Sequence, residues 1–207
     1  MQIIKKYFNE LQPGQLDKLS MMGEVYADWN QKINLVSRKD MDFFYIRHVL
    51  HSLAIYRYCP FLPGARVLDV GTGGGFPGIP LAICCPDTQF VLIDSIGKKI
   101  RVVNDIARQL KLDNVATRQV RAERMTGTFD FIVSRAVTSL PVFFDWVSDK
   151  ISHVSRHALP NGILYLKGGN LDAELAPLDW QYRVTDLAGL FEEDFFQTKK
   201  IIHLYEK

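Results

Sequence analysis

A run of glycines behind a short apolar segment is the part of this sequence best suited to binding a cofactor. Residues 67–70 are β-branched or apolar apart from one aspartate and predict a buried strand. The glycines that follow are Gly71, Gly73, Gly74, Gly75 and Gly78. Glycine lets the backbone turn sharply and lets a ligand approach the main chain. Pro77 stands where a helix would begin, a position that tolerates proline. Strand, glycine loop and helix predict the opening unit of a cofactor-binding α/β domain.

The glycines fit two frames that predict different cofactors. In one frame Gly73, Gly75 and Gly78 satisfy the dinucleotide fingerprint, which places a pyrophosphate on the N–H groups of a helix N-terminus. Pro77 and Pro80 lack an N–H group, so the first helical turn would be short of the donors that a diphosphate uses.

The other frame is Asp69-x-Gly71-x-Gly73-x-Gly75, and we expect its carboxylate to face the pocket. A phosphate would be repelled there, whereas a cationic ligand would be attracted. This frame resembles the first motif of class I S-adenosylmethionine-dependent methyltransferases, whose cofactor carries an ammonium and a sulfonium but no phosphate. We favour this frame, and a nicotinamide cofactor stays open as the alternative because a glycine loop alone is a weak signal.

Alternating strand and helix patterns have to position this loop. Further strands are predicted over residues 88–93, 114–120, 129–133, 163–166, 181–187 and 200–205, with helices over residues 76–85 and 98–112. This order predicts an α/β fold with a mostly parallel seven-stranded sheet, helices on both faces and an antiparallel edge. Amphipathic stripes before the breaker Pro63-Gly64 predict an N-terminal helical extension over residues 1–62, followed by a Rossmann-like domain over 63–207.

Further candidate site residues follow the ends of the predicted strands. Asp94 lies about 20 residues beyond the loop, where such folds place a carboxylate on ribose hydroxyls. Both candidate cofactors contain an adenosine ribose, so Asp94 does not choose between them. The turn Arg121-Ala122-Glu123 is expected beside the adenine. Ser134-Arg135-Ala136 and Lys167-Gly168-Gly169 are the predicted exit loops of the fourth and fifth strands.

The histidines and cysteines give no metal-binding pattern. His48 and His51 have a spacing that can chelate zinc, but no carboxylate or cysteine is close enough in sequence to complete a site. We therefore predict packing or surface histidines and no metal. Cys59, Cys84 and Cys85 lack a metal-type spacing, and an adjacent pair makes a poor disulfide, which favours reduced thiols in a cytoplasmic protein.

Composition and charge limit the class of protein without choosing its partner. A hydrophobic fraction of 47% and a charged fraction of 23% are those of a soluble globular chain. The sequence has no apolar run long enough to cross a bilayer and no signal-peptide core, so we expect no membrane association. Nothing indicates an obligate dimer, and we predict a monomer. Residues 90–140 carry nine Lys and Arg against five Asp and Glu, a bias that can steer a polyanion but is equally explained by solvated helix faces.

Several separate segments resemble one protein family in chain order. They are Trp29-Asn30, Asn34-Leu35, Arg47-His48, residues 69–81, Asp94-Ser95, Lys98-Lys99, Arg121-Ala122-Glu123, Phe129-Asp130, residues 134–137 and Lys167-Gly168. On these segments the chain resembles the glucose-inhibited division protein B family, bacterial guanine-N7 methyltransferases of 16S ribosomal RNA. The departures are His51, where the family often has aspartate, Gly74, where alanine or proline is common, and Lys199-Lys200, which replaces an arginine.

The resemblance implies S-adenosyl-L-methionine as the cofactor and 16S ribosomal RNA or the small ribosomal subunit as the partner. Loop and resemblance together predict these cofactor-binding residues: Asp69, Gly71, Gly73, Gly75, Phe76, Asp94, Ala122, Glu123 and Arg135. We predict that Arg135 and Lys167 also hold the RNA or the guanine. An arginine can address O6 or a phosphate while N7 stays free, and a lysine suits a backbone phosphate.

The chemistry of guanine N7 agrees with these residues. N7 carries an in-plane lone pair, so it can attack a sulfonium methyl in line without a general base, and catalysis reduces to alignment and electrostatics. Ser134-Arg135-Ala136 differs from the Asn-Pro-Pro-Tyr type of motif used on exocyclic amines, and no cysteine is placed for attack on a pyrimidine ring. A nicotinamide-dependent oxidoreductase and an RNA-binding assembly module without chemistry stay open as alternatives.

Overall fold

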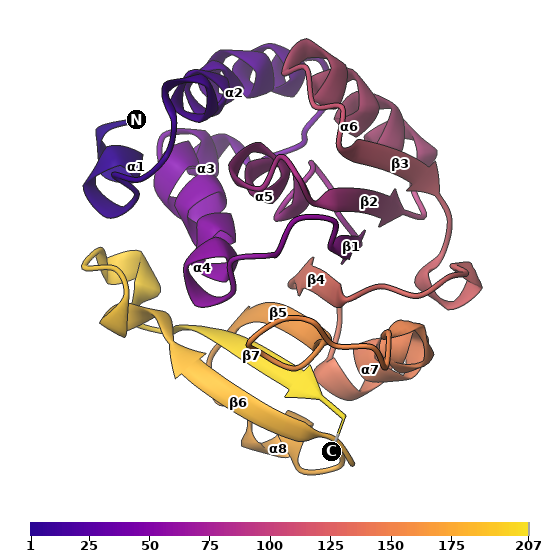
Figure 1. Ribbon diagram of the computed structural model, residues 1–207. Coiled ribbons are helices and arrows are strands. Elements are labelled where there is room, and N and C mark those ends of the chain that lie inside the picture. The colour runs from indigo at the N-terminus through magenta and orange to yellow at the C-terminus, as the bar shows by residue number, and fades with distance from the viewer. Residues whose placement is uncertain (207) are drawn as a thin grey trace.

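The N-terminal quarter of the chain is helical, and it lies along one side of a central sheet (Figure 1). The computed structural model describes residues 1–206. The first helices are α1 (Gln2–Tyr7), α2 (Pro13–Lys32), α3 (Arg38–Met41), the π-helical turn η1 (Tyr45–Leu50) and α4 (His51–Tyr58). In Figure 1, α2 lies beside α6, and α4 lies beside α5. The N-terminal helices are therefore part of the layer that covers one face of the sheet.

Seven strands form one sheet in the order β3-β2-β1-β4-β5-β7-β6. They are β1 (Arg66–Val70), β2 (Gln89–Asp94), β3 (Val115–Gln119), β4 (Phe131–Arg135), β5 (Gly162–Gly168), β6 (Gln181–Asp186) and β7 (Lys199–Tyr205). The first five strands pair in parallel, whereas β7 pairs antiparallel with both β5 and β6. The predicted mostly parallel sheet with an antiparallel edge is confirmed.

Side-chain alternation along the strands divides the core into two clusters. Val67 of β1 packs with the helices on one face, while Leu68 packs into the cluster on the other face. The remaining helices are α5 (Gly78–Cys84), α6 (Gly97–Gln109), α7 (Leu140–Val147) and α8 (Asp172–Leu175), with the short 3-10 turns η2 (Ala122–Arg124), η3 (Ser148–Lys150), η4 (Leu187–Gly189) and η5 (Asp194–Phe196). Buried residues of α2, α4, α5 and α6 belong to the first cluster, and those of α7 and α8 belong to the second. Helices therefore cover both faces, as predicted.

The N-terminal helices share one continuous core with the sheet. Ile4, Leu19 and Tyr26 are fully buried in the same cluster as Val67 and Phe131. The 1–62 and 63–207 division stays a prediction, because this packing joins the two parts without marking a boundary between them.

Strand ends differ from the sequence expectations where pairing extends them. The predicted fourth strand, 129–133, is β4 at Phe131–Arg135, because Ser134 and Arg135 pair with Tyr165 and Leu166 of β5. Arg135 therefore lies on the last residue of a strand and not in an exit loop. Lys167 likewise lies inside β5, where it pairs with a residue of β7. Cross-strand pairing is a tertiary effect that local sequence patterns do not report.

Candidate active site

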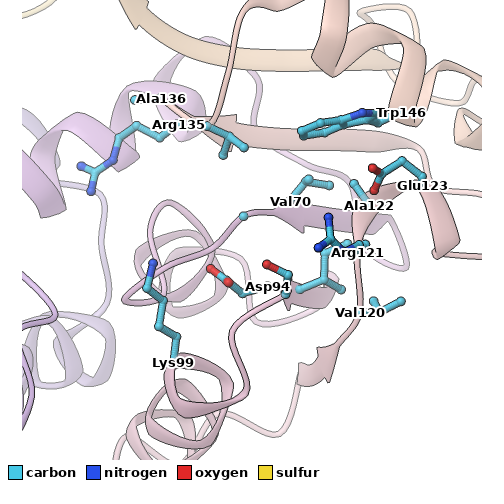
Figure 2. A pocket seen from close by; sticks show the side chains of 14 residues that line it. Val70, Asp94, Lys99, Val120, Arg121, Ala122, Glu123, Arg135, Ala136 and Trp146 are labelled. Carbon is cyan, nitrogen blue, oxygen red and sulfur yellow. The ribbon is translucent and has the colours of Figure 1, made fainter.

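A cavity of about 350 Å³ opens at the carboxyl ends of β1, β2, β3 and β4 (Figure 2). We call it the first cavity. Of the predicted cofactor-binding residues, the ones that line it are Gly71, Asp94, Ala122, Glu123 and Arg135. Parallel strands of an open α/β sheet present their ligand site at this edge, so residues that are distant in the sequence meet here.

Asp94 is held at the floor of the first cavity by two main-chain donors. Its Oδ2 accepts from the N–H of Gly73 at 3.1 Å, and its Oδ1 accepts from the N–H of Ile96 at 2.9 Å. The residue is 7% exposed. A carboxylate has about four lone-pair positions, so two donors leave capacity for further hydrogen bonds from a ligand in the cavity.

Asp69 lies beneath the glycine loop, and the expectation that it faces the pocket is wrong. It is fully buried, and its Oδ2 accepts from Thr72 Oγ1 at 2.6 Å and from the N–H of Gly78 at 2.9 Å. Burial raises the pKa of Asp69 to about 7, against the opposing effect of these two hydrogen bonds. The side chain points from β1 into the protein and not toward the cavity, and its observed contacts hold the glycine loop to the start of α5.

Five N–H groups of the glycine loop and the start of α5 are already engaged within the protein. Those of Thr72, Gly75 and Phe76 donate to main-chain carbonyl groups. Those of Gly73 and Gly78 donate to the two aspartate carboxylates. A pyrophosphate would have to compete with every one of these bonds and would meet the two carboxylates as well. The loop is therefore built against a diphosphate ligand.

Gly71 is where the loop approaches the end of β4. Its φ of +67° is in the left-handed region, and a Cβ there would lie 2.4 Å from Cγ2 of Val137. Among the other predicted loop residues, Gly73, Gly75 and Phe76 do not line the first cavity. The Phe76 ring is buried under the loop, against Tyr26. These three residues shape the loop, and Gly71 forms part of the cavity wall.

Arg135 crosses from the first cavity toward the N-terminal helices. Its Nη1 donates to the carbonyl of Arg47 at 3.0 Å, and its Nη2 lies 2.9 Å from Nδ1 of His48. The guanidinium also lies over the Phe76 ring, 5.2 Å from its centroid. Figure 2 shows this side chain pointing away from the other labelled residues. Burial lowers the pKa of Arg135 to about 10, so the group remains charged at neutral pH.

A second cavity of about 470 Å³ lies on the other side of residues 135–137. Its lining residues are Asp40, Arg47, His48, His51, Arg135, Ala136, Val137, Thr138, Leu166, Lys167, Gly168, Phe195 and Lys199. Residues 135–137 line both cavities, and we call them the shared wall. A group held in one cavity can therefore approach a group held in the other at this wall.

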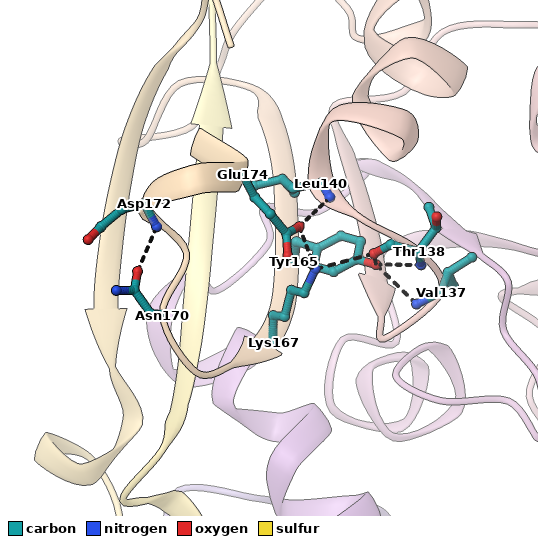
Figure 3. Close-up of polar contacts among 8 residues, drawn as sticks. All are labelled: Val137, Thr138, Leu140, Tyr165, Lys167, Asn170, Asp172 and Glu174. Atoms are coloured by element: carbon teal, nitrogen blue, oxygen red, sulfur yellow. Dashed lines mark hydrogen bonds and ion pairs between the residues drawn. The ribbon is translucent and has the colours of Figure 1, made fainter. Parts of the chain in front are cut away.

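Lys167 lines the second cavity, but its ammonium is engaged. Its Nζ lies 2.6 Å from Oε1 of Glu174 and 3.4 Å from the carbonyl of Thr138 (Figure 3). Oε2 of Glu174 in turn accepts from the N–H of Leu140 at 2.6 Å. The structure thus brings Lys167 and Arg135 to one cavity and places a carboxylate between Lys167 and the chain that follows the wall.

Tyr165 stabilises the shared wall through hydrogen bonds of its hydroxyl group. Its hydroxyl accepts from the N–H groups of Val137 and Thr138 at 3.0 and 3.2 Å, and it lies 3.0 Å from the carbonyl of Thr138, to which it donates (Figure 3). The ring is fully buried. The wall includes Ala136 at a φ of +52°, a conformation that costs a non-glycine residue about 1 kcal/mol or more. The hydroxyl of Tyr165 compensates part of that strain.

Sequence reasoning missed most of the second cavity. Arg47, Phe195 and Lys199 had no predicted role there, and His48 and His51 were both expected only to pack or to be exposed. The chain brings them together from α4, η1, η5 and β7, so no local spacing pattern joins them. The one available signal was the Arg47-His48 segment of the family resemblance, to which we assigned no function.

The described part of the chain offers neither a metal site nor a transmembrane helix. Within residues 1–206 no three His, Cys, Asp or Glu side chains are grouped in a way that could hold a metal ion. No helix in the same range combines the length and apolarity needed to cross a bilayer. Cys59, Cys84 and Cys85 are buried free thiols.

The sheet order, the glycine loop and the acid at the end of β2 define a class I S-adenosylmethionine-dependent methyltransferase fold. Solved structures agree. Precorrin-6y C5,15-methyltransferase from Geobacter metallireducens matches with a TM-score of 0.56 at 12% identity, over 84% of this chain and 92% of that chain. A SAM-dependent methyltransferase from Aquifex aeolicus matches with a TM-score of 0.55 at 14% identity, over 74% of this chain and 87% of that chain.

The chain belongs to the rRNA small subunit methyltransferase G family, whose model matches residues 15–200. A ribosomal RNA small subunit methyltransferase G from Christiangramia forsetii is 52% identical over 99% of this chain and 96% of its own length. The Bacteroides fragilis protein of that name is 48% identical over 99% of each chain. The predicted family is confirmed.

Proposed function

We propose that this protein transfers a methyl group from S-adenosylmethionine to N7 of a guanine in 16S ribosomal RNA. The observation that carries the choice of cofactor is the glycine loop, most of whose N–H groups donate to main-chain carbonyl groups or to Asp69 and Asp94. Such a loop suits a cofactor without phosphate groups. Family membership and the cavity beyond the shared wall support the choice of substrate.

The residues of the first cavity fit the groups of this cofactor. Asp94 can accept from the ribose hydroxyls with the lone pairs that its two main-chain donors leave free. Ile93, Val120 and Ala122 offer apolar surface for an adenine ring. Glu123 adds a second carboxylate to the lining. When bound, the cofactor supplies an electrophilic methyl carbon on a sulfonium.

The second cavity holds the guanine in this proposal, with N7 directed at the shared wall. N7 attacks in line and needs no proton acceptor, so the residues around it have to orient the base and exclude water. Arg135 provides a fixed positive charge beside O6 or an adjacent phosphate. Lys167 is held by Glu174, and an RNA phosphate reaches it by sharing or replacing that carboxylate.

We also propose that the protein acts in the cytoplasm, as a monomer and away from membranes. Ribosomal RNA as the substrate supports this location. Target guanines readable at their N7 edge lie in single-stranded or bulged regions, because the deep, narrow major groove of a regular A-form helix hides that edge. We therefore expect a folded segment of 16S ribosomal RNA, free or within the small subunit, as the partner.

Transfer of a labelled methyl group tests the proposal. The protein is incubated with labelled S-adenosylmethionine and small ribosomal subunits from cells that lack its gene. We expect label in the 16S ribosomal RNA of these subunits. Subunits from wild-type cells should take up none, because their target base is already methylated. Calorimetry with S-adenosylmethionine and with NAD runs in parallel. NAD binding alone would favour the oxidoreductase, and RNA binding without label would favour an assembly module.

A further inference from the structure

Attack by N7 does not by itself select guanine, because adenine carries the same nitrogen. The two purines differ on the six-membered ring. Guanine presents an O6 acceptor beside an N1–H donor, whereas adenine presents an N6 amino donor beside an N1 acceptor. If the protein methylates guanine as proposed above, side chains of the second cavity have to read this edge.

Two histidines that line that cavity each carry a ring nitrogen that is buried without a hydrogen-bond partner among the described residues. They are Nε2 of His48 and Nε2 of His51. His51 is only 5% exposed. Buried polar atoms in proteins are almost always hydrogen-bonded. Two nitrogens without a partner, on residues of one cavity, therefore point to a ligand that forms hydrogen bonds with them.

Arg135 sets the hydrogen-bonding polarity of His48. Its Nη2 lies 2.9 Å from Nδ1 of His48, and a guanidinium can only donate. Nδ1 must therefore be the unprotonated acceptor. Burial, assisted by the charge of Arg135, lowers the pKa of His48 to about 4, so the ring is neutral at pH 7. In a neutral ring the single proton then sits on Nε2, and the free nitrogen of His48 is a donor.

The carbonyl of Arg47 sets the opposite polarity in His51. The Arg47 carbonyl raises the pKa of His51, as a hydrogen-bond acceptor near the ring does, and Nε2 has no partner among the described residues, so we place the ring proton on Nδ1. Burial and the nearby Arg135 charge hold the pKa of His51 well below its usual range. The ring is neutral, and its free Nε2 is an acceptor. The π-helical turn that carries Arg47 and His48 directly precedes His51, and such turns are frequent at functional sites.

We propose that His48 and His51 select the target base, with His48 donating from Nε2 to O6 and His51 accepting at Nε2 from N1–H. The order of the two side chains fits the purine. His48 contacts Arg135 of the shared wall, toward which N7 is directed, and O6 is the neighbour of N7. His51 lies three residues further along the helical segment, as N1 lies beyond O6. Adenine would set donor against donor and acceptor against acceptor.

Access to His51 involves Phe195. This half-buried ring lines the second cavity and packs edge-on against His51, with 5.3 Å between the centroids. A base reaches Nε2 of His51 by displacing the Phe195 ring, which can then stack on the purine. The ammonium of Lys199 lies over the Phe195 ring, 5.0 Å from its centroid, and adds positive charge at the cavity rim.

Matched substitutions at His51 test the proposal by kinetics. His51→Phe keeps a ring among Phe195 and Phe196 but removes the acceptor, whereas His51→Gln places an amide oxygen near the position of Nε2. We expect His51→Phe to lower kcat/KM for unmethylated small subunits about 10- to 100-fold. Where the loss is about 100-fold, the kcat/KM of His51→Gln should be at least about tenfold higher than that of His51→Phe. The affinity for S-adenosylmethionine should stay within about twofold in both, since His51 lies outside the first cavity.

His157→Phe is the control, because it also removes an imidazole, here a half-buried one, but lies against Phe131, at the opposite end of β4. It should leave kcat/KM per folded molecule unchanged. An active wild-type protein with an equally active His51→Phe variant would overturn the proposal, as would equal losses in the Phe and Gln variants. An inactive wild-type protein would instead overturn the proposed function.

The tautomers can be measured without a substrate. Nitrogen-15 NMR of the histidine rings should show His48 neutral at pH 7 with its proton on Nε2, and His51 neutral with its proton on Nδ1. Arg135→Ala should release the His48 ring to a mixture of tautomers. A His48 proton on Nδ1 in the wild-type protein would contradict the assignment.

Discussion

The two cavities on either side of the shared wall are built in different ways. The first is formed by consecutive strand ends, and the acid at its floor, Asp94, is held by main-chain donors. The second gathers side chains from η1, α4, β5 and β7, and its unpaired polar atoms belong to two neutral histidines. A site made from neighbouring strand ends depends on backbone geometry, whereas a site that gathers distant elements depends on side chains that fix one another.

Because of this difference, we expect substitutions in the two cavities to affect different steps. Changes in the first cavity should act on cofactor affinity, because the backbone there is fixed and the ligand contacts are few. Changes in the second cavity should act on the use of RNA. Changes in the shared wall should act on both, since residues 135–137 line both cavities.

The largest effect is expected from Asp94→Ala. The ribose loses two hydrogen bonds to a charged acceptor, and the affinity for S-adenosylmethionine should fall about 100-fold in calorimetry. Asp105→Ala on α6 is the control, because Asp105 bonds to Trp29 and Gln109 and not to a cavity residue. An Asp94→Ala affinity within about threefold of wild type would remove Asp94 from the cofactor site.

Arg135→Ala comes next, because it removes the charge at the shared wall and frees the His48 ring. We expect kcat for methyl transfer to fall about 50-fold, since a fixed charge beside the reacting base is lost. Single-turnover transfer to small subunits at saturating cofactor measures this loss. Unchanged methylation together with normal cofactor affinity would place Arg135 outside the reaction.

Tyr165→Phe should have a smaller effect on both cavities together. The ring stays in the core, but Val137 and Thr138 lose a buried partner. We expect the free energy of unfolding to fall by about 2 kcal/mol and kcat/KM by about tenfold. Urea unfolding and steady-state kinetics measure the two changes. Lost stability with full activity would show that methyl transfer does not depend on the hydrogen bonds of Tyr165 to the shared wall.

The smallest effect is on the pH dependence of stability. Histidine in the unfolded chain takes up a proton near pH 6.5, whereas burial lowers the pKa of His48 to about 4 in the folded protein. Between these values the unfolded state binds more protons, so stability is complete above about pH 6.5 and is lost as the pH falls toward about 4.

His48→Gln removes this contribution. The difference in unfolding free energy between about pH 7.5 and about pH 5.5 should be about 1 kcal/mol smaller in this variant than in the wild-type protein. Urea titrations at the two pH values measure it. Equal differences in the two proteins would mean that the pKa of His48 is the same in the folded and unfolded states.

Sequence patterns predicted the first cavity well because its residues follow strand ends. Gly71 directly follows β1, Asp94 ends β2 and Ala122 comes three residues after β3, so the sheet places them together without further information. The predicted direction of the Asp69 side chain was wrong. Alternation along a strand shows which residues share a face but not what covers that face.

The second cavity could not be read from local patterns. His48 and His51 look like ordinary helix residues until Arg135 and the Arg47 carbonyl fix their rings. Tyr165 is a core aromatic by every sequence criterion, and only its hydrogen bonds to the wall separate it from a phenylalanine. Such roles depend on contacts between elements that are far apart in the sequence.

Mapping of N7-methylguanosine in 16S ribosomal RNA is the most direct test of the account. Borohydride and aniline cleave the chain at this modified base, and RNA is compared from cells with the gene, without it, and with the gene restored. We predict one cleavage that is present, lost and regained in that order. A cleavage pattern that is identical in all three would contradict methylation of guanine N7 by this protein.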